Sequence, residues 1–107
     1  MKKDIILFID TSSNQEITVA LKINDKNIKL TSPVDKMRAQ KVLPLIDKIL
    51  SSCQVKITDL THIEVNPGPG SFTGLRVGIA VANALSFSLK IPVNKLEIGQ
   101  YETPRYD

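Results

Sequence analysis

The stretch that decides the fold is Pro67-Gly68-Pro69-Gly70-Ser71-Phe72-Thr73-Gly74-Leu75-Arg76. An apolar, strand-like run, Ile63 to Asn66, precedes it, and a long segment of small and aliphatic residues, Val77 to Leu89, follows it. Prolines fix φ and glycines allow conformations that other residues rarely adopt, so the backbone can turn sharply from a strand into a helix. Ser71 or Thr73 can cap that helix. The sequence therefore predicts a strand, a tight turn and a helix.

Two interpretations of this turn are open from the residues alone. The first is purely structural, a turn that brings the helix close onto a sheet. The second is a phosphate-binding loop at the helix N-terminus, where backbone N–H groups favour anions. A Walker A loop is excluded, because Leu75-Arg76 stands where that pattern requires a lysine followed by serine or threonine. The candidate phosphate-loop residues are Asp10, Thr11, Ser12, Gly68, Gly70, Ser71 and Thr73.

The composition is that of an ordinary globular domain. The 107 residues are 42% hydrophobic and 23% charged, which predicts one domain with an ordered core over about residues 4–95 and a polar tail, 96–107. The net charge of +3 is spread over scattered lysines and does not indicate nucleic-acid binding. A single cysteine, Cys53, favours the reducing cytoplasm. No apolar run reaches the roughly 20 residues of a membrane helix, so no membrane is expected.

The first third of the chain predicts three antiparallel strands. Ile5 to Ile9 is a continuous apolar run, typical of a central strand that is covered on both faces. Ile17 to Ile23 alternates as a second strand, and a hairpin turn leads to a short third strand, Ile28 to Thr31. We expect helices on one face of this sheet, and either the tail from Leu96 onward or another subunit on the other.

Two helices and two further strands are predicted after this meander. The first helix spans about Asp35 to Cys53, and Pro44 should kink it or mark its effective start. Ile63 to Asn66 follows through a helical crossover, so we expect a fourth strand parallel to the first. The second helix follows the turn, and its small residues at four-residue spacing allow close backbone approach to the sheet or to another helix. Ile91 to Val93 is expected to be a short fifth strand.

Both helices carry more apolar surface than one small sheet can cover. The apolar arc of the first is roughly 160° wide, against about 100° for a usual surface helix, and the second is apolar nearly all round. This excess predicts a partner subunit, with two helices from each subunit in a four-helix bundle. The expected partner-binding residues are Val42, Leu45, Ile49, Leu75, Arg76, Ile79 and Asn83.

Residues suited to chemistry are sparse. Asp10 and Asp59 lie in strand-adjacent turns without a second acid beside them, and His62 lacks the neighbours of a metal site. Cys53 closes the apolar face of a helix, where a core role is expected. The sequence therefore predicts no catalytic residue, no cofactor, no metal, and no ATPase or peptidase activity of its own. An independent nucleotide-binding enzyme and a self-associating structural domain remain as alternatives.

Four motifs of the chain also occur together in one known family. They are Asp10-Thr11-Ser12, Gln40-Lys41-Val42-Leu43-Pro44-Leu45-Ile46, Asp59-Leu60 and the run from Gly68 to Gly78. In these the chain resembles the bacterial TsaB family, also called YeaZ. The resemblance extends from about Ile5 to Val93, which is most of this chain but only the first half of a usual family member. The interdomain cleft of that fold is therefore not expected to form within this chain.

The resemblance implies an α/β domain of the actin-like, ribonuclease H-like (ASKHA) class. Its element order would be β-β-β-α-β-α-β, with a mixed five-stranded sheet and two helices on one face. The resemblance also implies a non-catalytic subunit of the complex that makes N6-threonylcarbamoyladenosine (t6A) in tRNA. Its partners would be a TsaD-like catalytic subunit, bound through the two helices, and a TsaE-like ATPase, with tRNA contacted indirectly. A homodimer through the same helices is the alternative assembly.

Overall fold

The computed structural model describes residues 3–34 and 38–105. The elements are β1 (Ile5–Asp10), β2 (Glu16–Ile23), β3 (Lys26–Pro33), α1 (Arg38–Ser52), a short 3-10 helix η1 (Ile57–Asp59), β4 (His62–Val65) and α2 (Phe72–Leu89). Pro44 lies inside α1 and does not mark its start. The predicted beginning of this helix, residues 35–37, lies outside the described residues.

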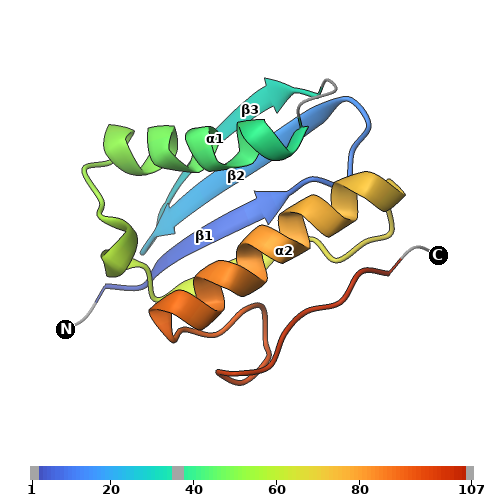
Figure 1. Ribbon diagram of the computed structural model, residues 1–107. Helices are drawn as coiled ribbons and strands as arrows, with labels where there is room; N and C mark the ends of the chain where they lie inside the picture. The colour runs from blue at the N-terminus through green and yellow to red at the C-terminus, as the bar shows by residue number, and fades with distance from the viewer. Residues whose placement is uncertain (1–2, 35–37, 106–107) are drawn as a thin grey trace.

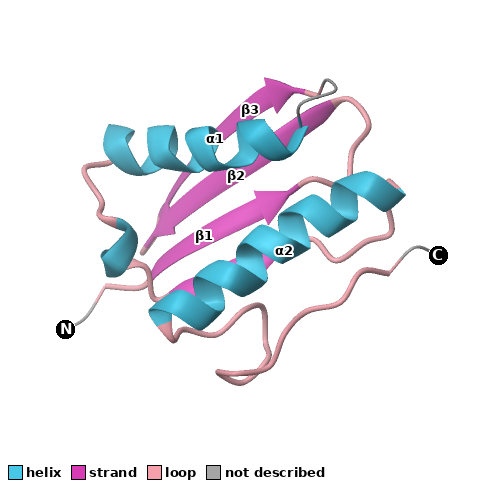
Figure 2. Cartoon of the chain, in the orientation of Figure 1, coloured by secondary structure: helices cyan, strands magenta, loops and turns pink. Residues whose placement is uncertain are grey.

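The sheet has four strands in the order β3-β2-β1-β4. β1 pairs antiparallel with β2 and parallel with β4, and β2 pairs antiparallel with β3. Figure 2 shows β1, β2 and β3 side by side. The predicted meander and the parallel fourth strand are confirmed. The α/β class is confirmed as well, with a helical crossover joining β3 to β4.

Both helices lie on one face of the sheet (Figure 1). Alternate residues of β1 and β2 point toward them and are buried, because successive side chains of a strand point to opposite faces. The core therefore sits between one helical layer and one sheet layer. Its largest fully buried members include Leu7, Ile9, Ile17, Leu21, Val42, Ile49, Ile63 and Leu75. Among the described residues, no helix is long and apolar enough to cross a membrane.

The predicted fifth strand is a single bridge, so the expected five-stranded sheet is wrong within the described residues. Ile63 and Val93 form one parallel bridge beside β4. Ile63 N donates to Pro92 O at 3.0 Å, and Asn94 N donates to Ile63 O at 2.7 Å. Asn94 then adopts a left-handed conformation with φ of 54°, which turns the chain away from the sheet edge.

The tail does not cross the second face of the sheet, so that expectation is wrong for residues 96–105. It runs beside α2, as Figure 1 shows, after Val93 has formed its bridge to Ile63 of β4. Arg105 N donates to Pro67 O at 2.7 Å, and Glu102 binds Asn83 of α2. Ile6 and Phe8, on the face away from the helices, are half-buried by their strand neighbours.

Candidate functional site

The two polar loops that the sequence singled out meet where β1 and β4 end. Ser71 N donates to Ser12 O at 3.0 Å. Asn66 Nδ2 donates to Asp10 Oδ2 at 3.3 Å and to Ser12 Oγ at 3.1 Å. A Cβ on Gly70 would lie 2.6 Å from Ser12 Cβ, so only glycine allows this approach of the loops. We call the residues Asp10, Thr11, Ser12, Asn66, Gly70 and Ser71 the loop cluster.

The Asp10 side chain stabilises the turn in which it lies. Its Oδ1 accepts from Ser12 N at 2.9 Å and from Ser12 Oγ at 2.6 Å, the pattern of an aspartate-stabilised turn. Its other oxygen accepts from Asn66. The part of the chain that the structure describes has no group of three or more His, Cys, Asp or Glu residues that could hold a metal ion. The contacts of this carboxylate are therefore those of a turn residue.

Thr11 joins the end of β1 to the first turns of α2. Its side chain is 1% exposed, and its hydroxyl donates to Gly74 O and accepts from Gly78 N at 3.0 Å. In a regular α-helix, a carbonyl accepts from the N–H four residues later. The Thr11 hydroxyl therefore bridges one such pair of backbone groups in α2, Gly74 O and Gly78 N. A Cβ on Gly78 would overlap Thr11 Oγ1. The glycines of α2 therefore allow this helix to pack closely against its own domain, and Thr11 is buried in that contact.

The start of α2 is capped by Ser71, one of the two caps that the sequence predicted. Ser71 Oγ accepts from Gly74 N at 3.4 Å, and Ser71 O accepts from Leu75 N at 2.9 Å. Thr73 is exposed. Gly68 N donates to Asn66 Oδ1 at 3.0 Å, and a Cβ on Gly68 would overlap the backbone of Arg105. The sequence places no lysine between Lys56 and Lys90 that could anchor a phosphate beside this turn.

The predicted partner-binding residues divide into buried and accessible groups. Leu75 and Ile79 were expected on an exposed side of the second helix, and both are buried; Ile79 is 4% exposed. They belong to the chain's own core together with Val42 and Ile49. Leu45 and Asn83 are half-buried, and Arg76 is exposed. Any contact with another chain would thus be made mainly by residues other than the four buried ones.

A different set of apolar residues is accessible on the helices. Leu43 of α1 is 57% exposed and Phe87 of α2 is 64% exposed. Ala80 and Ala84, also exposed, lie on the same side of α2 as Phe87. We call these exposed apolar residues of the two helices, Leu43 of α1 and Ala80, Ala84 and Phe87 of α2, the outer helix face. Sequence reasoning missed it, although the spacing of residues 80, 84 and 87 on one helical side was a signal that could have shown it.

The tail extends this surface at its Phe87 end. A hollow of about 370 Å³ lies between α2 and the tail. It is lined by Asn83, Ala84, Phe87, Ser88 and Tyr101. Tyr101 is itself 50% exposed. Its contact with the helix had no local signal, because Tyr101 lies 14 positions after Phe87 in the sequence.

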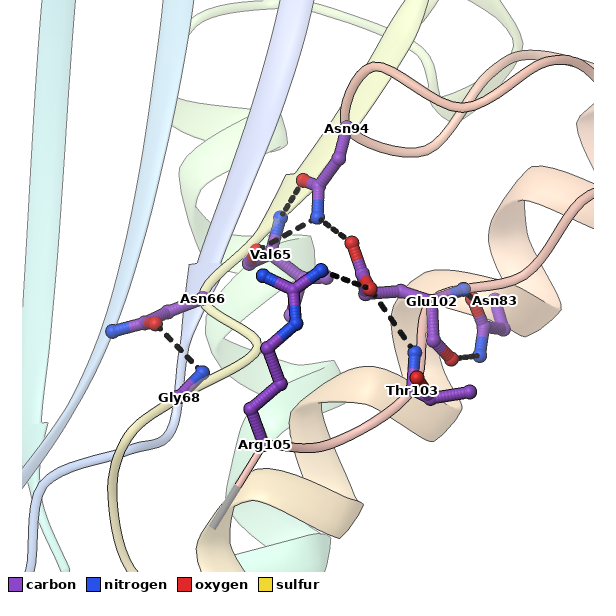
Figure 3. A network of polar contacts seen from close by, with 8 residues as sticks. All are labelled: Val65, Asn66, Gly68, Asn83, Asn94, Glu102, Thr103 and Arg105. Carbon is purple, nitrogen blue, oxygen red and sulfur yellow. Dashed lines mark hydrogen bonds and ion pairs between the residues drawn. The ribbon is translucent and has the colours of Figure 1, made fainter. Parts of the chain in front are cut away.

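The side chain of Asn83 is hydrogen-bonded to the backbone of the tail. Its Oδ1 accepts from Glu102 N and its Nδ2 donates to Glu102 O, both at 2.9 Å (Figure 3). The Glu102 side chain is buried, and its carboxylate accepts from Asn94 Nδ2 at 2.7 Å and pairs with Arg105 at 3.5 Å. Sequence reasoning did not identify Asn94, Glu102 or Arg105. Together they fix the path of the tail along α2.

Comparison with known proteins identifies relatives of this chain. A family model described as TsaD, tRNA N6-adenosine threonylcarbamoyltransferase, matches residues 12–98. The chain is 40% identical over 90 residues to the tRNA threonylcarbamoyladenosine biosynthesis protein TsaB of Buchnera aphidicola subsp. Schizaphis graminum, covering 84% of this chain and 42% of that protein. It is 37% identical over 90 residues to TsaB of Bacillus subtilis, covering 83% and 39%.

Solved structures give the same result. YeaZ from Pseudomonas aeruginosa superposes with a TM-score of 0.81 at 30% identity, covering 88% of this chain and 44% of that one. The chain thus spans about two fifths of the length of the curated relatives it matches. The family model covers most of the chain, and the TsaB resemblance noted in the sequence is confirmed. The chain therefore belongs to the family of tRNA threonylcarbamoyladenosine biosynthesis proteins that includes TsaD and TsaB (YeaZ).

Proposed function

We propose that this chain is a non-catalytic subunit in t6A biosynthesis that binds a TsaD-like catalytic subunit through its outer helix face. One contrast carries the proposal. The candidate phosphate-loop side chains of Asp10, Thr11 and Ser12 are paired within the fold, whereas Leu43 and Phe87 lie exposed on the helices. Polar side chains that are hydrogen-bonded within the fold support a structural role for the loop. Large apolar side chains that are exposed on the helices support a contact with another protein.

The outer helix face has the composition of a helix-docking surface. Ala80 and Ala84 are small, so a partner helix can approach the α2 backbone closely. Leu43 and Phe87 provide large apolar side chains on the two helices, and such anchors supply much of the affinity of protein interfaces. Arg76, Asp47 and Lys48 are exposed on the same two helices and give the surface a polar margin. Two helices from each subunit would pack as a bundle.

The remaining parts of the complex follow from this role. A TsaE-like ATPase would join the pair, tRNA would be contacted through the catalytic subunit, and the assembly would be cytoplasmic. The matched names of the relatives support the pathway. The internal pairing of the loop cluster supports a chain without nucleotide chemistry of its own.

Reconstitution tests the proposal. The TsaD-like enzyme of the same organism would be assayed for t6A formation on tRNA, in the presence of the other biosynthetic components, with and without this chain. We expect the chain to raise product formation and Ala84→Glu to remove that effect. The chain alone should neither hydrolyse ATP nor give a saturable nucleotide-binding curve. Product formation that is indifferent to the chain, or ATP turnover that disappears in Asp10→Asn, would contradict it.

A further inference from the structure

The face of the sheet away from the helices has an apolar centre. Ile6 and Phe8 of β1 and Ala20 of β2 lie there, because their strand neighbours Ile5, Leu7 and Leu21 point toward the helices. Within residues 3–34 and 38–105, the helices cover the opposite face and the tail runs beside α2 (Figure 1), after the bridge of Val93 to Ile63 of β4. We call this surface the open sheet face.

Strand register arranges the open sheet face in rows that run across the strands. From β3 to β4 the middle row reads Lys29, Ala20, Phe8 and Glu64, since Ala20 pairs with Lys29 and with Phe8, and Phe8 pairs with Glu64. The row thus runs from a positive residue through a small and a large one to a negative residue.

The rows on either side flank this pattern. The row nearer the start of β1 reads Asn27, Lys22, Ile6 and His62. The row nearer its end reads Thr31, Thr18 and Asp10. A hollow of about 520 Å³ includes both Phe8 and Ala20 in its lining.

We propose that two copies of this chain pack through their open sheet faces, related by a two-fold axis that runs parallel to the strands between β1 and β2. This rotation reverses each row. Lys29 then faces Glu64 of the second copy, and Phe8 faces Ala20 of the second copy. Opposite charges meet at both margins, and a large side chain meets a small one twice at the centre. Such self-complementarity is what a two-fold interface requires.

The neighbouring rows fit the same rotation. Lys22 faces Ile6 of the second copy, so its aliphatic stem covers an apolar side chain while its ammonium group reaches water. His62 faces Asn27, and Asp10 faces Thr18, so none of these three rows brings like charges together. Glu16, on the same face of β2, lies beyond them, next to Thr18. Sheets that pack face to face keep their strands within about 30° of each other, which this arrangement allows.

Charge also excludes the other two-fold orientation. An axis that runs across the strands along the middle row would keep each strand over its own copy and would set Lys29 against Lys29 and Glu64 against Glu64. Like charges in direct opposition are unfavourable at an interface. The helices lie on the far side of the sheet, so the proposed dimer leaves the outer helix face accessible. The inference is therefore independent of the proposed function.

Sedimentation equilibrium of the full chain over a range of concentrations tests the dimer. We expect wild type to associate, and Lys29→Glu and Glu64→Lys each to weaken association about tenfold or more, because each places like charges together at both margins. The double variant Lys29→Glu/Glu64→Lys should regain association, since it restores opposite charges in reversed order. Both residues are exposed, so thermal melting at a concentration where wild type is monomeric can verify that each variant folds.

Ala84→Glu, on the opposite side of the domain, is the matched control and should associate as wild type does. Ala20→Glu, the same substitution on the open sheet face, should prevent association. A wild-type chain that stays monomeric would overturn the proposal. So would a double variant no tighter than the single ones, or association lost in Ala84→Glu and kept in Ala20→Glu, which would place the contact on the helices.

Discussion

Asn94 binds Val65 as the backbone of a neighbouring strand would. Its Oδ1 accepts from Val65 N at 2.8 Å and its Nδ2 donates to Val65 O at 3.1 Å (Figure 3). One side-chain amide thus satisfies both backbone groups of Val65 at the edge of the sheet. The chain can therefore leave the sheet after a single bridge at Val93 without leaving these polar groups unpaired.

The two hydrogen bonds between Asn94 and Val65 predict how much stability the chain loses when the side-chain amide of Asn94 is removed. Asn94→Ala would leave Val65 N and O without their partner and would withdraw one hydrogen bond from the buried Glu102. It would also place alanine at a positive φ, which asparagine tolerates better. We expect the free energy of unfolding to fall by about 2–4 kcal/mol, measured by urea denaturation.

Asn24→Ala is the matched control for this change. Asn24 has nearly the same backbone conformation, with φ of 52°, but it is exposed on the turn between β2 and β3. Asn24→Ala should therefore lower the free energy of unfolding only by the cost of placing alanine at a positive φ, about 1 kcal/mol. Equal losses for the two variants would show that the Asn94 amide contributes little beyond its backbone preference.

The contact between Thr11 and Gly78 predicts a second effect. Gly78→Ala should destabilise the chain by about 1–3 kcal/mol, although alanine is favoured over glycine in a helix by about 1 kcal/mol, because the added methyl group overlaps the Thr11 hydroxyl. Thermal and urea unfolding would measure it. The double variant Thr11→Ala/Gly78→Ala should be more stable than the sum of the single losses implies. Additive losses would mean that the two residues do not interact.

The burial of Ile79 gives a third prediction. Ile79→Asp should lower the free energy of unfolding by about 3–5 kcal/mol, because it introduces an unpaired charge into the core. That is a large share of the stability of a small domain. A shift of the melting transition would show it in the isolated chain. An Ile79→Asp variant that melts like wild type would show that this side chain is accessible.

The same residue shows where sequence reasoning succeeds and fails. The apolar period of 3.6 identified both helices, and the alternation of β2 identified the meander, because periodicity records which side of an element is buried. It does not record what covers that side. The wide arcs of α1 and α2 suggested a partner at Val42, Ile49 and Ile79, whereas these residues contact the chain's own sheet and helices.

The tail could not be placed from its sequence for a related reason. Its position depends on contacts between residues distant in sequence, such as Asn83 with Glu102 and Pro67 with Arg105, which have no local pattern. The loop cluster was easier to predict, because the glycines in and beside it, Gly68 and Gly70, indicated close backbone approach. Its polar residues left two interpretations open, and the hydrogen bonds of Asp10 and Thr11 favour the structural one.

The most direct test of the account is the affinity of the TsaD-like enzyme of the same organism for three forms of this chain: wild type, Ala84→Glu and Ala20→Glu. The two variants carry the same substitution on opposite faces of one domain, so both add the same charge and the same side-chain volume. Titration calorimetry should show that Ala84→Glu binds about a hundredfold more weakly or worse, as an unpaired charge in a desolvated interface requires. Ala20→Glu should bind as wild type does, with both variants keeping the melting transition that wild type shows at concentrations where it is monomeric. Undiminished binding of Ala84→Glu would contradict the account and place the partner elsewhere on the chain.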